Sequence, residues 1–415
     1  MLVYEFKLAG KQQQYSLIDE AIRTALFVRN SCIRYWMDNS MIGKYDLSAY
    51  CKVLAENFEW AKKLNSMARQ ASSDRAWAAI SRFFSNCKKK ISGKKGEAAT
   101  APCRNLQGNG GFPKFKKRGH SVEYKTTGWK LSEDRKYITL TDGFKIGKLK
   151  LIGTFDLHFY QIDQIKRVRL VRRADGYYAQ FCIDVERNIE ATPTKNLVGL
   201  DVGLTHFYTD SNGDHVENPR FLRKAEKSLK RLQKRVSRKL VKSQKKGERQ
   251  SNNYKKAKQK LARMHLKVSR QRKDFAVKLA RCVVMSNDLV AYEDLQVRNM
   301  VKNHNLAKSI SDAAWYQFRC WLEYFGKVFG KITIAVPPQY TSINCSSCGN
   351  EVKKTLSTRT HKCLCGAELC RDENAALNVL AKGLRTYPRA LGNENAWEEN
   401  ALYLDLATSQ DLVTR

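Results

Sequence analysis

Two short cysteine hooks near the C-terminus carry the clearest metal-binding pattern in the sequence. They read Cys345-Ser-Ser-Cys348-Gly and Cys363-Leu-Cys365-Gly. Each hook ends in glycine, which allows the backbone to turn tightly around a metal ion. Four thiolates in two hooks are typical of tetrahedral Zn²⁺ with no open coordination position. The pattern therefore predicts a structural zinc site.

Two further residues leave the ligand set open. The second hook is one residue shorter than the usual C-x-x-C, so Cys370 could replace Cys365 or merely pack. His361 is another spare ligand. The N-terminal residues lack the charged-then-apolar plan of a signal peptide, so a metal site is favoured over a disulfide framework.

Three acidic residues form a second candidate site. Asp201 ends the apolar run LVGLD, Glu293 ends LVAYE, and Asp372 opens a helical pattern. A carboxylate at the end of a buried strand is costly unless it is paired, hydrogen-bonded or bound to a metal. Hard oxygen ligands suit Mg²⁺ or Mn²⁺, and two such ions about 4 Å apart can promote phosphodiester hydrolysis. By itself, Asp372 could equally be a helix N-cap.

The composition indicates a polyanionic partner. The chain of 415 residues contains 76 Lys and Arg but only 40 Asp and Glu, giving a net charge of +36. An imbalance of this size favours nucleic acid as the partner. A membrane surface is the competing anion, but no apolar run approaches the roughly 20 residues of a membrane-spanning helix. We therefore expect a cytoplasmic protein with no membrane partner.

Alternating and helical patterns predict the elements that must position these residues. Residues 2–8 alternate as a strand, and residues 16–90 show apolar positions three and four apart, as helices do. A basic linker is expected at 88–102. Strands follow between 111 and 187, with a hairpin at Asp175-Gly176.

Buried strands and helices alternate in the second half of the chain. The strands are expected near 196–201, 287–295 and 331–338, with a turn at Asn212-Gly213. Two basic helices are expected within 220–285, broken near 247–253. The remaining expectations are one helix at 309–330, one at 372–384, and a disordered tail at 385–415.

Two basic segments are candidate phosphate contacts. In GFPKFKKRG, lysines are interleaved with phenylalanines, and the basic helices carry one apolar stripe and a densely charged outer face. A solvated helical pair is the structural alternative, but such charge density repels itself unless phosphate neutralises it. The candidate side chains are Lys114, Lys116, Lys117, Lys230, Arg231, Lys234, Arg235 and Arg238.

Several motifs taken together resemble the TnpB family, the transposon-encoded RNA-guided nucleases related to compact type V CRISPR effectors. The motifs are GLDVGLTHFYTDSNG, YEDLQVRNM, LAKSISDAAW, QYTSINCSSCGN and RDENAALNVL. GFPKFKKRG and SDRAWAAISRFF resemble the N-terminal half of the family. The resemblance runs to about residue 384 and is dense after residue 196.

The resemblance implies a multidomain α+β fold. An RNase H-like (RuvC) nuclease domain would contain an inserted zinc ribbon, and a wedge β-barrel would be split by a helical recognition domain. The expected ranges are 1–15 and 111–195 for the barrel, 16–110 for the helical domain, 196–340 and 369–384 for the nuclease domain with its basic hairpin at 220–285, and 341–368 for the ribbon.

The resemblance also implies an activity and its partners. Asp201, Glu293 and Asp372 match the catalytic carboxylates that hold Mg²⁺ or Mn²⁺, and the four hook cysteines match the Zn²⁺ ligands. The partners would be a guide RNA from the transposon end and double-stranded target DNA beside a short motif, with a monomeric protein favoured.

One segment and one further position of the family pattern bear on specificity and on activity. Gln70, Ser73 and Arg75 match the segment that contacts the flanking DNA motif. The family usually has an aspartate where this chain has Cys370. That aspartate is not one of the three metal-binding carboxylates, so we expect activity to survive.

Four other functions remain open at this point. They are a guided DNA-binding protein that has lost cleavage, a CRISPR type V effector with the same chemistry, a strand-transferring transposase, and a zinc-ribbon RNA-binding protein. A protein that has lost cleavage should lack one of the catalytic carboxylates. All three are present in this sequence, which argues against the first of these alternatives.

Overall fold

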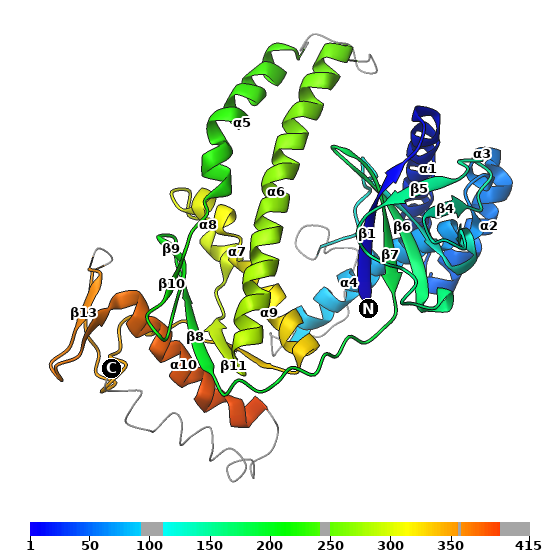
Figure 1. Ribbon diagram of the computed structural model, residues 1–415. Coiled ribbons are helices and arrows are strands. Elements are labelled where there is room, and N and C mark those ends of the chain that lie inside the picture. The colour runs from blue at the N-terminus through cyan, green and yellow to red at the C-terminus, as the bar shows by residue number, and fades with distance from the viewer. Residues whose placement is uncertain (93–110, 241–249, 356–357, 391–415) are drawn as a thin grey trace. The chain divides into compact units, whose positions relative to one another are not determined.

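The computed structural model describes residues 1–92, 111–240, 250–355 and 358–390, and the chain forms two compact units, Met1–Glu186 and Arg187–Arg415 (Figure 1). Within these described ranges, no helix is both long and apolar enough to cross a membrane.

The first unit contains a seven-stranded antiparallel sheet, in the order β2-β6-β7-β1-β5-β4-β3. The edge strands β2 and β3 follow each other in the chain through the single turn Thr126–Gly128, so the sheet curls into a nearly closed barrel. The predicted hairpin at Asp175-Gly176 is confirmed between β6 and β7. The strands are β1 (Leu2–Ala9), β2 (Ser121–Lys125), β3 (Trp129–Leu131), β4 (Tyr137–Leu140), β5 (Leu149–Ile152), β6 (Ile165–Arg173) and β7 (Gly176–Ile183).

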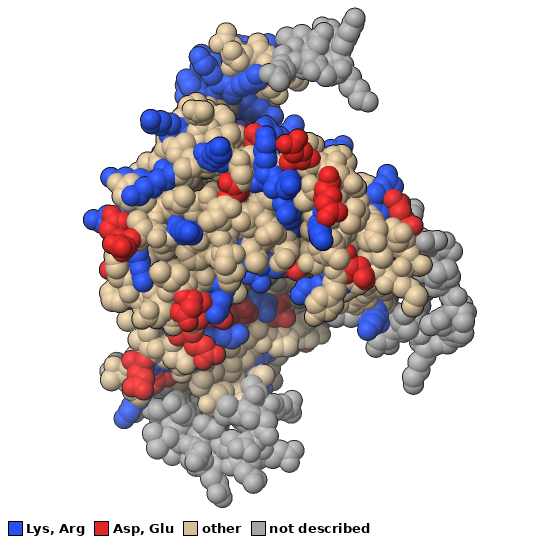
Figure 2. All heavy atoms as spheres, turned by 90° about the vertical axis from the view of Figure 1, so that its right-hand side faces the viewer, with Lys and Arg blue, Asp and Glu red and all other residues tan. Residues whose placement is uncertain are grey.

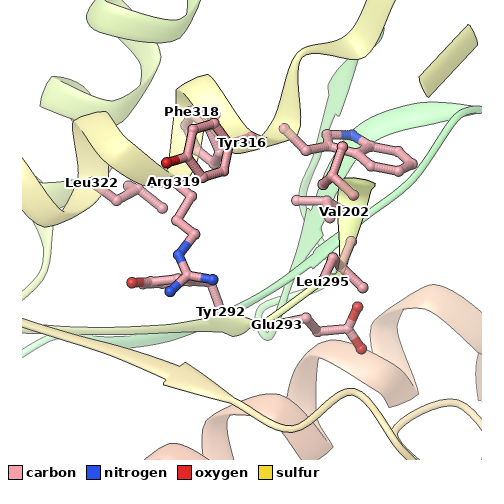
Figure 3. Close-up of a pocket in the computed structure, with 10 residues that line it drawn as sticks. Val202, Tyr292, Glu293, Leu295, Tyr316, Phe318, Arg319 and Leu322 are labelled. Carbon is pink, nitrogen blue, oxygen red and sulfur yellow. The ribbon is translucent and has the colours of Figure 1, made fainter. Parts of the chain in front are cut away.

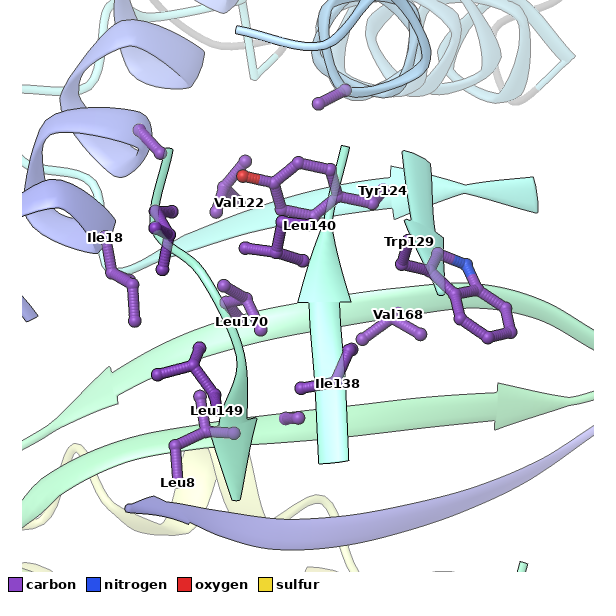
Figure 4. Close-up of a cluster of buried hydrophobic side chains, with 14 of the residues drawn as sticks. Leu8, Ile18, Val122, Tyr124, Trp129, Ile138, Leu140, Leu149, Val168 and Leu170 are labelled. Atoms are coloured by element: carbon purple, nitrogen blue, oxygen red, sulfur yellow. The ribbon is translucent and has the colours of Figure 1, made fainter. Parts of the chain in front are cut away.

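One apolar core fills this barrel (Figure 4). Alternate side chains of the strands point inward, so Leu8, Ile138, Leu149 and Leu170 meet although they come from four strands. Ile18 adds a contact from the first helix. The barrel is thus held together by residues from both sides of the helical segment.

Four helices interrupt the barrel between β1 and β2: α1 (Gln12–Asp38), α2 (Lys44–Asn57), α3 (Glu59–Lys62) and α4 (Ser66–Ser92). The first begins at Gln12, earlier than the predicted Ser16. The Gln14 side chain explains this start, because it accepts the N–H of Lys11 at 2.8 Å and donates to the Ile146 carbonyl at 2.8 Å. Most of the predicted linker at 88–102 lies outside the described residues.

The second unit contains a five-stranded sheet in the order β10-β9-β8-β11-β12. Strands β8, β11 and β12 are parallel, whereas β9 is antiparallel to β8, and β10 at the edge is antiparallel to β9. The predicted turn at Asn212-Gly213 is confirmed between β9 and β10. The strands are β8 (Leu197–Val202), β9 (His206–Asp210), β10 (His215–Glu217), β11 (Leu289–Glu293) and β12 (Ile332–Val336).

The helices of the second unit are α5 (Phe221–Arg238), α6 (Asn252–Ser286), α7 (Val297–Met300), α8 (Ala307–Ala313), α9 (Trp315–Phe329) and α10 (Arg371–Ala390). The prediction of a single helix at 309–330 is wrong. Ala314 adopts a left-handed conformation (φ 59°), which ends α8 and starts α9 in a new direction.

Helix α10 continues to Ala390, beyond the predicted end at 384. The first six residues of the segment predicted to be a disordered tail are therefore helical. The rest of that tail, 391–415, lies outside the described residues, as do residues 247–249 of the predicted break at 247–253, and α6 already begins at Asn252.

Candidate metal centres

The three acidic residues come from three different elements of the second unit. Asp201 is the penultimate residue of β8, Glu293 is the last residue of β11, and Asp372 lies in the first turn of α10. The register pairs Leu200 of β8 with Tyr292 of the parallel strand β11. Asp201 and Glu293 therefore follow at the same edge of the sheet, as expected for neighbouring parallel strands.

Burial raises the pKa of two of these carboxylates. Burial holds the pKa of Asp201 well above its usual value, and the negative charges of Glu293 and Asp372 raise it further. Burial also raises the pKa of Glu293, although the Thr341 hydroxyl and Lys382 oppose this shift. A bound cation would relieve this repulsion, so the oxygen donors fit a hard divalent ion.

An apolar pocket beside Glu293 explains part of its burial (Figure 3). Val202 and Leu295 line it on the side of the carboxylate, and Phe318 and Leu322 line it from α9. The Arg319 guanidinium lies 5.8 Å from the Tyr292 ring centre. Water is thus displaced from one side of Glu293, which disfavours its ionised form.

Two glycines allow α10 to approach the sheet closely enough to bring Asp372 to the other carboxylates. A Cβ on Gly199 of β8 would lie 2.2 Å from the Ala376 carbonyl oxygen, and a Cβ on Gly383 would lie 2.6 Å from the Ala291 Cβ. Any side chain at Gly199 would push the helix away from β8. The position of Asp372 therefore depends on a glycine two residues before Asp201.

Two asparagines of α10 fix the loop that leads into the first cysteine hook. Fully buried Asn374 accepts the N–H of Ser346 at 2.9 Å and donates to the Asn344 carbonyl at 2.8 Å. One turn later, Asn378 donates to the carbonyls of Thr341 and Asn344. The Thr341 hydroxyl in turn donates to Glu293 at 2.7 Å.

An arginine of the cysteine-rich segment completes the surroundings of Asp372. The Arg359 guanidinium lies 3.7 Å from the Asp372 carboxylate and donates weakly to the Thr205 hydroxyl at 3.4 Å. Its backbone carbonyl accepts the N–H of Arg371 at 2.7 Å, at the start of α10. Sequence reasoning assigned no role to Thr341, Asn374, Asn378 and Arg359. The first three lie inside the motifs that resemble the family. Membership of those motifs is the sequence feature that could have pointed to them.

The four hook cysteines meet in one cluster, with all sulfur atoms within 4.8 Å of one another. Cys345 and Cys365 are 3.7 Å apart, and Cys348 and Cys363 are 3.5 Å apart. Tetrahedral zinc–thiolate bonds of about 2.3 Å place sulfurs roughly 3.8 Å apart. The cluster therefore fits a closed tetrahedral site in spite of the shortened second hook.

The two spare ligands lie outside this cluster. Cys370 is exposed at the end of β14 (Glu368–Cys370), which pairs with β13 (Thr360–Lys362). His361 is fully buried, and its Nδ1 is hydrogen-bonded to Lys354.

The Cys345 thiol has a lowered pKa. Burial raises this pKa, but hydrogen bonds from the backbone N–H groups of Cys348 and Ser347 and from the His361 ring lower it to about 6. A low thiol pKa favours the thiolate that binds metal.

Helix α1 positions the basic segment 111–119 of the first unit. The buried Arg29 donates to the Lys114 carbonyl at 3.3 Å, and Asn30 donates to the Lys116 carbonyl at 2.9 Å. These contacts bind only the backbone. The side chains of Lys114, Lys116 and Lys117 consequently remain exposed.

The structure separates the three residues predicted on α4. Ser73 is 2% exposed and its hydroxyl donates to the Gln70 carbonyl, so it is not available to a ligand. Arg75 is bound to the buried Glu123 at 3.2 Å. Gln70 is also half-buried, but its side chain makes no comparable ion pair with a described residue.

The basic residues predicted on α5 are all exposed. Lys230, Arg231, Lys234, Arg235 and Arg238 lie opposite the buried Leu229 and Val236. Figure 2 shows lysine and arginine side chains gathered at the far end of the α5–α6 hairpin. At the base of the hairpin, Asp312 accepts the N–H of Leu222 and the guanidinium of Arg272, which ties the two helices together.

Comparison with known proteins identifies two family models, which together match most of the described second unit and the last residues of the first. A family model described as "Probable transposase" matches residues 180–304, and one described as "Cas12f1-like, TNB domain" matches residues 315–379. The solved structure described as "Structure of the mini-RNA-guided endonuclease CRISPR-Cas_phi3" superposes with a TM-score of 0.51 at 10% identity, over 92% of each chain. That likeness shows a shared multidomain α+β fold.

Two relatives extend the comparison to sequence. A "Putative RNA-guided DNA endonuclease" of Streptomyces pristinaespiralis is 41% identical over 196 residues, which are 47% of this chain and 47% of that protein. "Putative RNA-guided DNA endonuclease InsQ" of Escherichia coli (strain K12) is 31% identical over 290 residues, which are 66% of this chain and 68% of that protein. The match thus spans about half of the first relative and two thirds of the second. With the matched models, this similarity establishes that the chain belongs to the TnpB family.

Proposed function

We propose that this chain is a metal-dependent, RNA-guided endonuclease that cleaves double-stranded DNA. Its catalytic residues would be Asp201, Glu293 and Asp372. The observation that carries the proposal is that these carboxylates, from β8, β11 and α10, lie close enough for Glu293 and Asp372 to raise the pKa of Asp201. The sheet supports it, because three parallel strands extended on one side by the antiparallel β9–β10 hairpin suit an RNase H-like (RuvC) domain.

Asp201, Glu293 and Asp372 would hold Mg²⁺ or Mn²⁺, which when bound activates water and stabilises the leaving oxygen of a phosphodiester. Thr341 binds Oε1 of Glu293 and thereby fixes the orientation of that carboxylate. Arg359 is 61% exposed beside Asp372, so its guanidinium can contact a DNA phosphate near the site.

The cysteine cluster would hold a structural Zn²⁺ through Cys345, Cys348, Cys363 and Cys365. This ion would close the ribbon that supplies Arg359. It would also stabilise the loop that Asn374 and Asn378 bind and that presents Thr341 to Glu293. The zinc would therefore contribute to cleavage through the shape of the acidic site, without touching the DNA.

The nucleic-acid partners would bind the exposed basic side chains. We propose that the guide RNA and its DNA heteroduplex contact Lys114, Lys116 and Lys117 in the first unit, and the basic face of α5 in the second. The barrel would be the wedge domain, and α1–α4 the recognition domain, with Gln70 near the flanking DNA motif. The guide would derive from the transposon end, and the protein would act as a monomer.

The test is guided cleavage by the full chain purified with its RNA. Asp201→Ala should abolish cleavage of a matched plasmid while guided binding remains. Asp214→Ala, which changes an exposed aspartate on the β9–β10 turn, is the matched control and should cleave normally. Unchanged cleavage by the Asp201 variant would overturn the site assignment.

Strand transfer is a second candidate, because the model matched at residues 180–304 is described as a transposase. Sequencing of the reaction products separates the two activities. Cut ends support the endonuclease, whereas ends joined to new DNA would support strand transfer. Sequencing of the co-purified RNA would show whether the guide comes from a transposon end or from a CRISPR repeat.

A further inference from the structure

We propose that His206, His215 and Glu217 form a second, solvent-accessible metal site, which binds a divalent transition metal such as Zn²⁺, Ni²⁺ or Co²⁺. The three residues lie on the β9–β10 hairpin, at the edge of the five-stranded sheet. They belong neither to the acidic site nor to the cysteine cluster. The proposal does not depend on the proposed function.

The strand register brings the three side chains together. His206 pairs directly with Glu217 across the hairpin, and His215 precedes Glu217 by two residues and so shares its face. A bulge between Val216 and Glu217 sets this register, which would otherwise be shifted by one residue. The arrangement therefore depends on an irregularity that a simple alternating pattern would not predict.

The distances suit shared coordination of one ion. One ligand atom from each residue lies within 4.8 Å of the others. The Nδ1 atom of His206 is 3.4 Å from a carboxylate oxygen of Glu217, and the two imidazole rings are centred 4.1 Å apart. His215 and Glu217 are exposed, so small rotations of their side chains can close the remaining distance.

The state of His206 favours a ligand over a simple ion pair. Its Nδ1 is buried and makes no hydrogen bond to any part of the chain that the structure describes. An exposed His–Glu pair stabilises a protein by about 1 kcal/mol or less, and it would leave the adjacent His215 without a role. Two imidazoles and one carboxylate bound to the same ion would use all three side chains.

The donor set selects the class of metal. Imidazole nitrogen prefers Zn²⁺, Ni²⁺, Co²⁺ and Cu²⁺ over Mg²⁺, which binds oxygen ligands. Three protein ligands at the surface leave a fourth position for water or for an oxygen of another molecule.

A bound metal would also hold β10 against β9. Asn218, next in the chain after β10, donates to the Leu204 carbonyl at 3.1 Å just before α5 begins.

The test is metal binding by the full-length protein in excess Mg²⁺, with Co²⁺ as the probe. The wild type should bind one more equivalent than the double variant His206→Gln/His215→Gln. Glu217→Gln should lower the affinity for this additional Co²⁺ at least about tenfold. A loss of about tenfold is already usual for residues that only support a metal ligand. His304→Gln, which changes an exposed histidine elsewhere in the second unit, should bind like the wild type.

The absorption spectrum distinguishes the two transition-metal sites. Co²⁺ in the cysteine cluster gives thiolate-to-metal charge-transfer bands, whereas Co²⁺ on histidine and glutamate does not. The additional equivalent should therefore lack these bands, and all variants should retain the thiolate-bound equivalent, which shows that they are folded. Equal Co²⁺ binding by the wild type and the double variant would overturn the proposal.

Discussion

Two carboxylate sites, one in each unit, use the same chemical group in opposite ways. Glu123 of the first unit has a side chain only 4% exposed, surrounded by three arginines. Asp201 and Glu293 of the second unit are half-buried, and the strongest influences on Asp201 after burial are other carboxylates. The two sites therefore differ in the sign of the charges around them as well as in their burial.

The consequences appear in the pKa values. Burial raises the pKa of Glu123, but the hydrogen bond from Arg169 and the charges of Arg75, Arg169 and Arg167 lower it below its usual value. Within the described residues no comparable set of arginines surrounds Asp201, and Arg371 opposes the rise of its pKa. A neutralised carboxylate stabilises a fold, whereas a cluster of carboxylates that repel one another fits the cation site that we propose here.

The largest expected effect comes from loosening the acidic site without changing a carboxylate. Cys348→Ser should remove the metal of the cysteine cluster and lower the cleavage rate at least about tenfold, because the loop that orients Glu293 loses its support. Zinc content and single-turnover cleavage measure both effects. Cys370→Ser, outside the cluster, is the control and should retain both. Full cleavage by a zinc-free Cys348 variant would show that the two sites are independent.

The second prediction exchanges the charge at each site. Glu123→Gln should destabilise the first unit by about 3 kcal/mol, because three arginines lose their buried partner. Asp201→Asn should leave the stability of the second unit unchanged or increase it, since it removes repulsion. Hydrogen exchange of the amides of β2 and β8 reports on each unit separately. Equal destabilisation by both variants would contradict the contrast between the sites.

Acidic pH should affect the two sites in opposite directions. The folded pKa of Glu123 lies below its unfolded value of about 4.5, so its stabilisation is present above that pH and is lost as the pH falls through the folded pKa. The folded pKa values of Asp201 and Glu293 are raised, so their destabilisation is relieved as the pH falls through those values.

Protonation of the acidic site should also compete with its metal. The Mg²⁺ concentration needed for half-maximal cleavage should consequently rise on acidification, beginning above the usual carboxylate range, because the ionised carboxylates are the ligands. Titration of cleavage with Mg²⁺ at several pH values measures this. A requirement for Mg²⁺ that did not change with pH would argue against the raised pKa values.

The smallest effect compares an exposed cation with one already bound to the chain. Arg235→Ala on α5 should reduce the slope of log affinity against log salt by about 0.7–0.9, the contribution of one phosphate contact. Arg75→Ala should leave the slope unchanged, because its guanidinium is bound to Glu123. The slope is measured by RNA binding at several salt concentrations. A smaller slope for Arg75→Ala would show that Arg75 contacts a phosphate, as the sequence predicts.

Much of the candidate chemistry could be predicted because it is encoded locally. The cysteine hooks, their glycines and the acidic ends of two apolar runs lie within a few residues of the features that identify them. The ends of β8 and β11 were predictable because buried strands are read from short apolar runs. The excess of basic residues likewise indicated a polyanionic partner before any fold was known.

The tertiary structure decided which of these residues have partners. Arg75 and Arg235 are the same residue type on helices, yet only Arg75 meets a buried glutamate, 48 positions along the chain. Gly199 has its role because α10 returns to cover β8, and the histidines meet because of one bulge. The sequence by itself determined the residue types, the element ends and the net charge. Which charges are neutralised depends on contacts between distant segments, and local patterns do not encode those contacts.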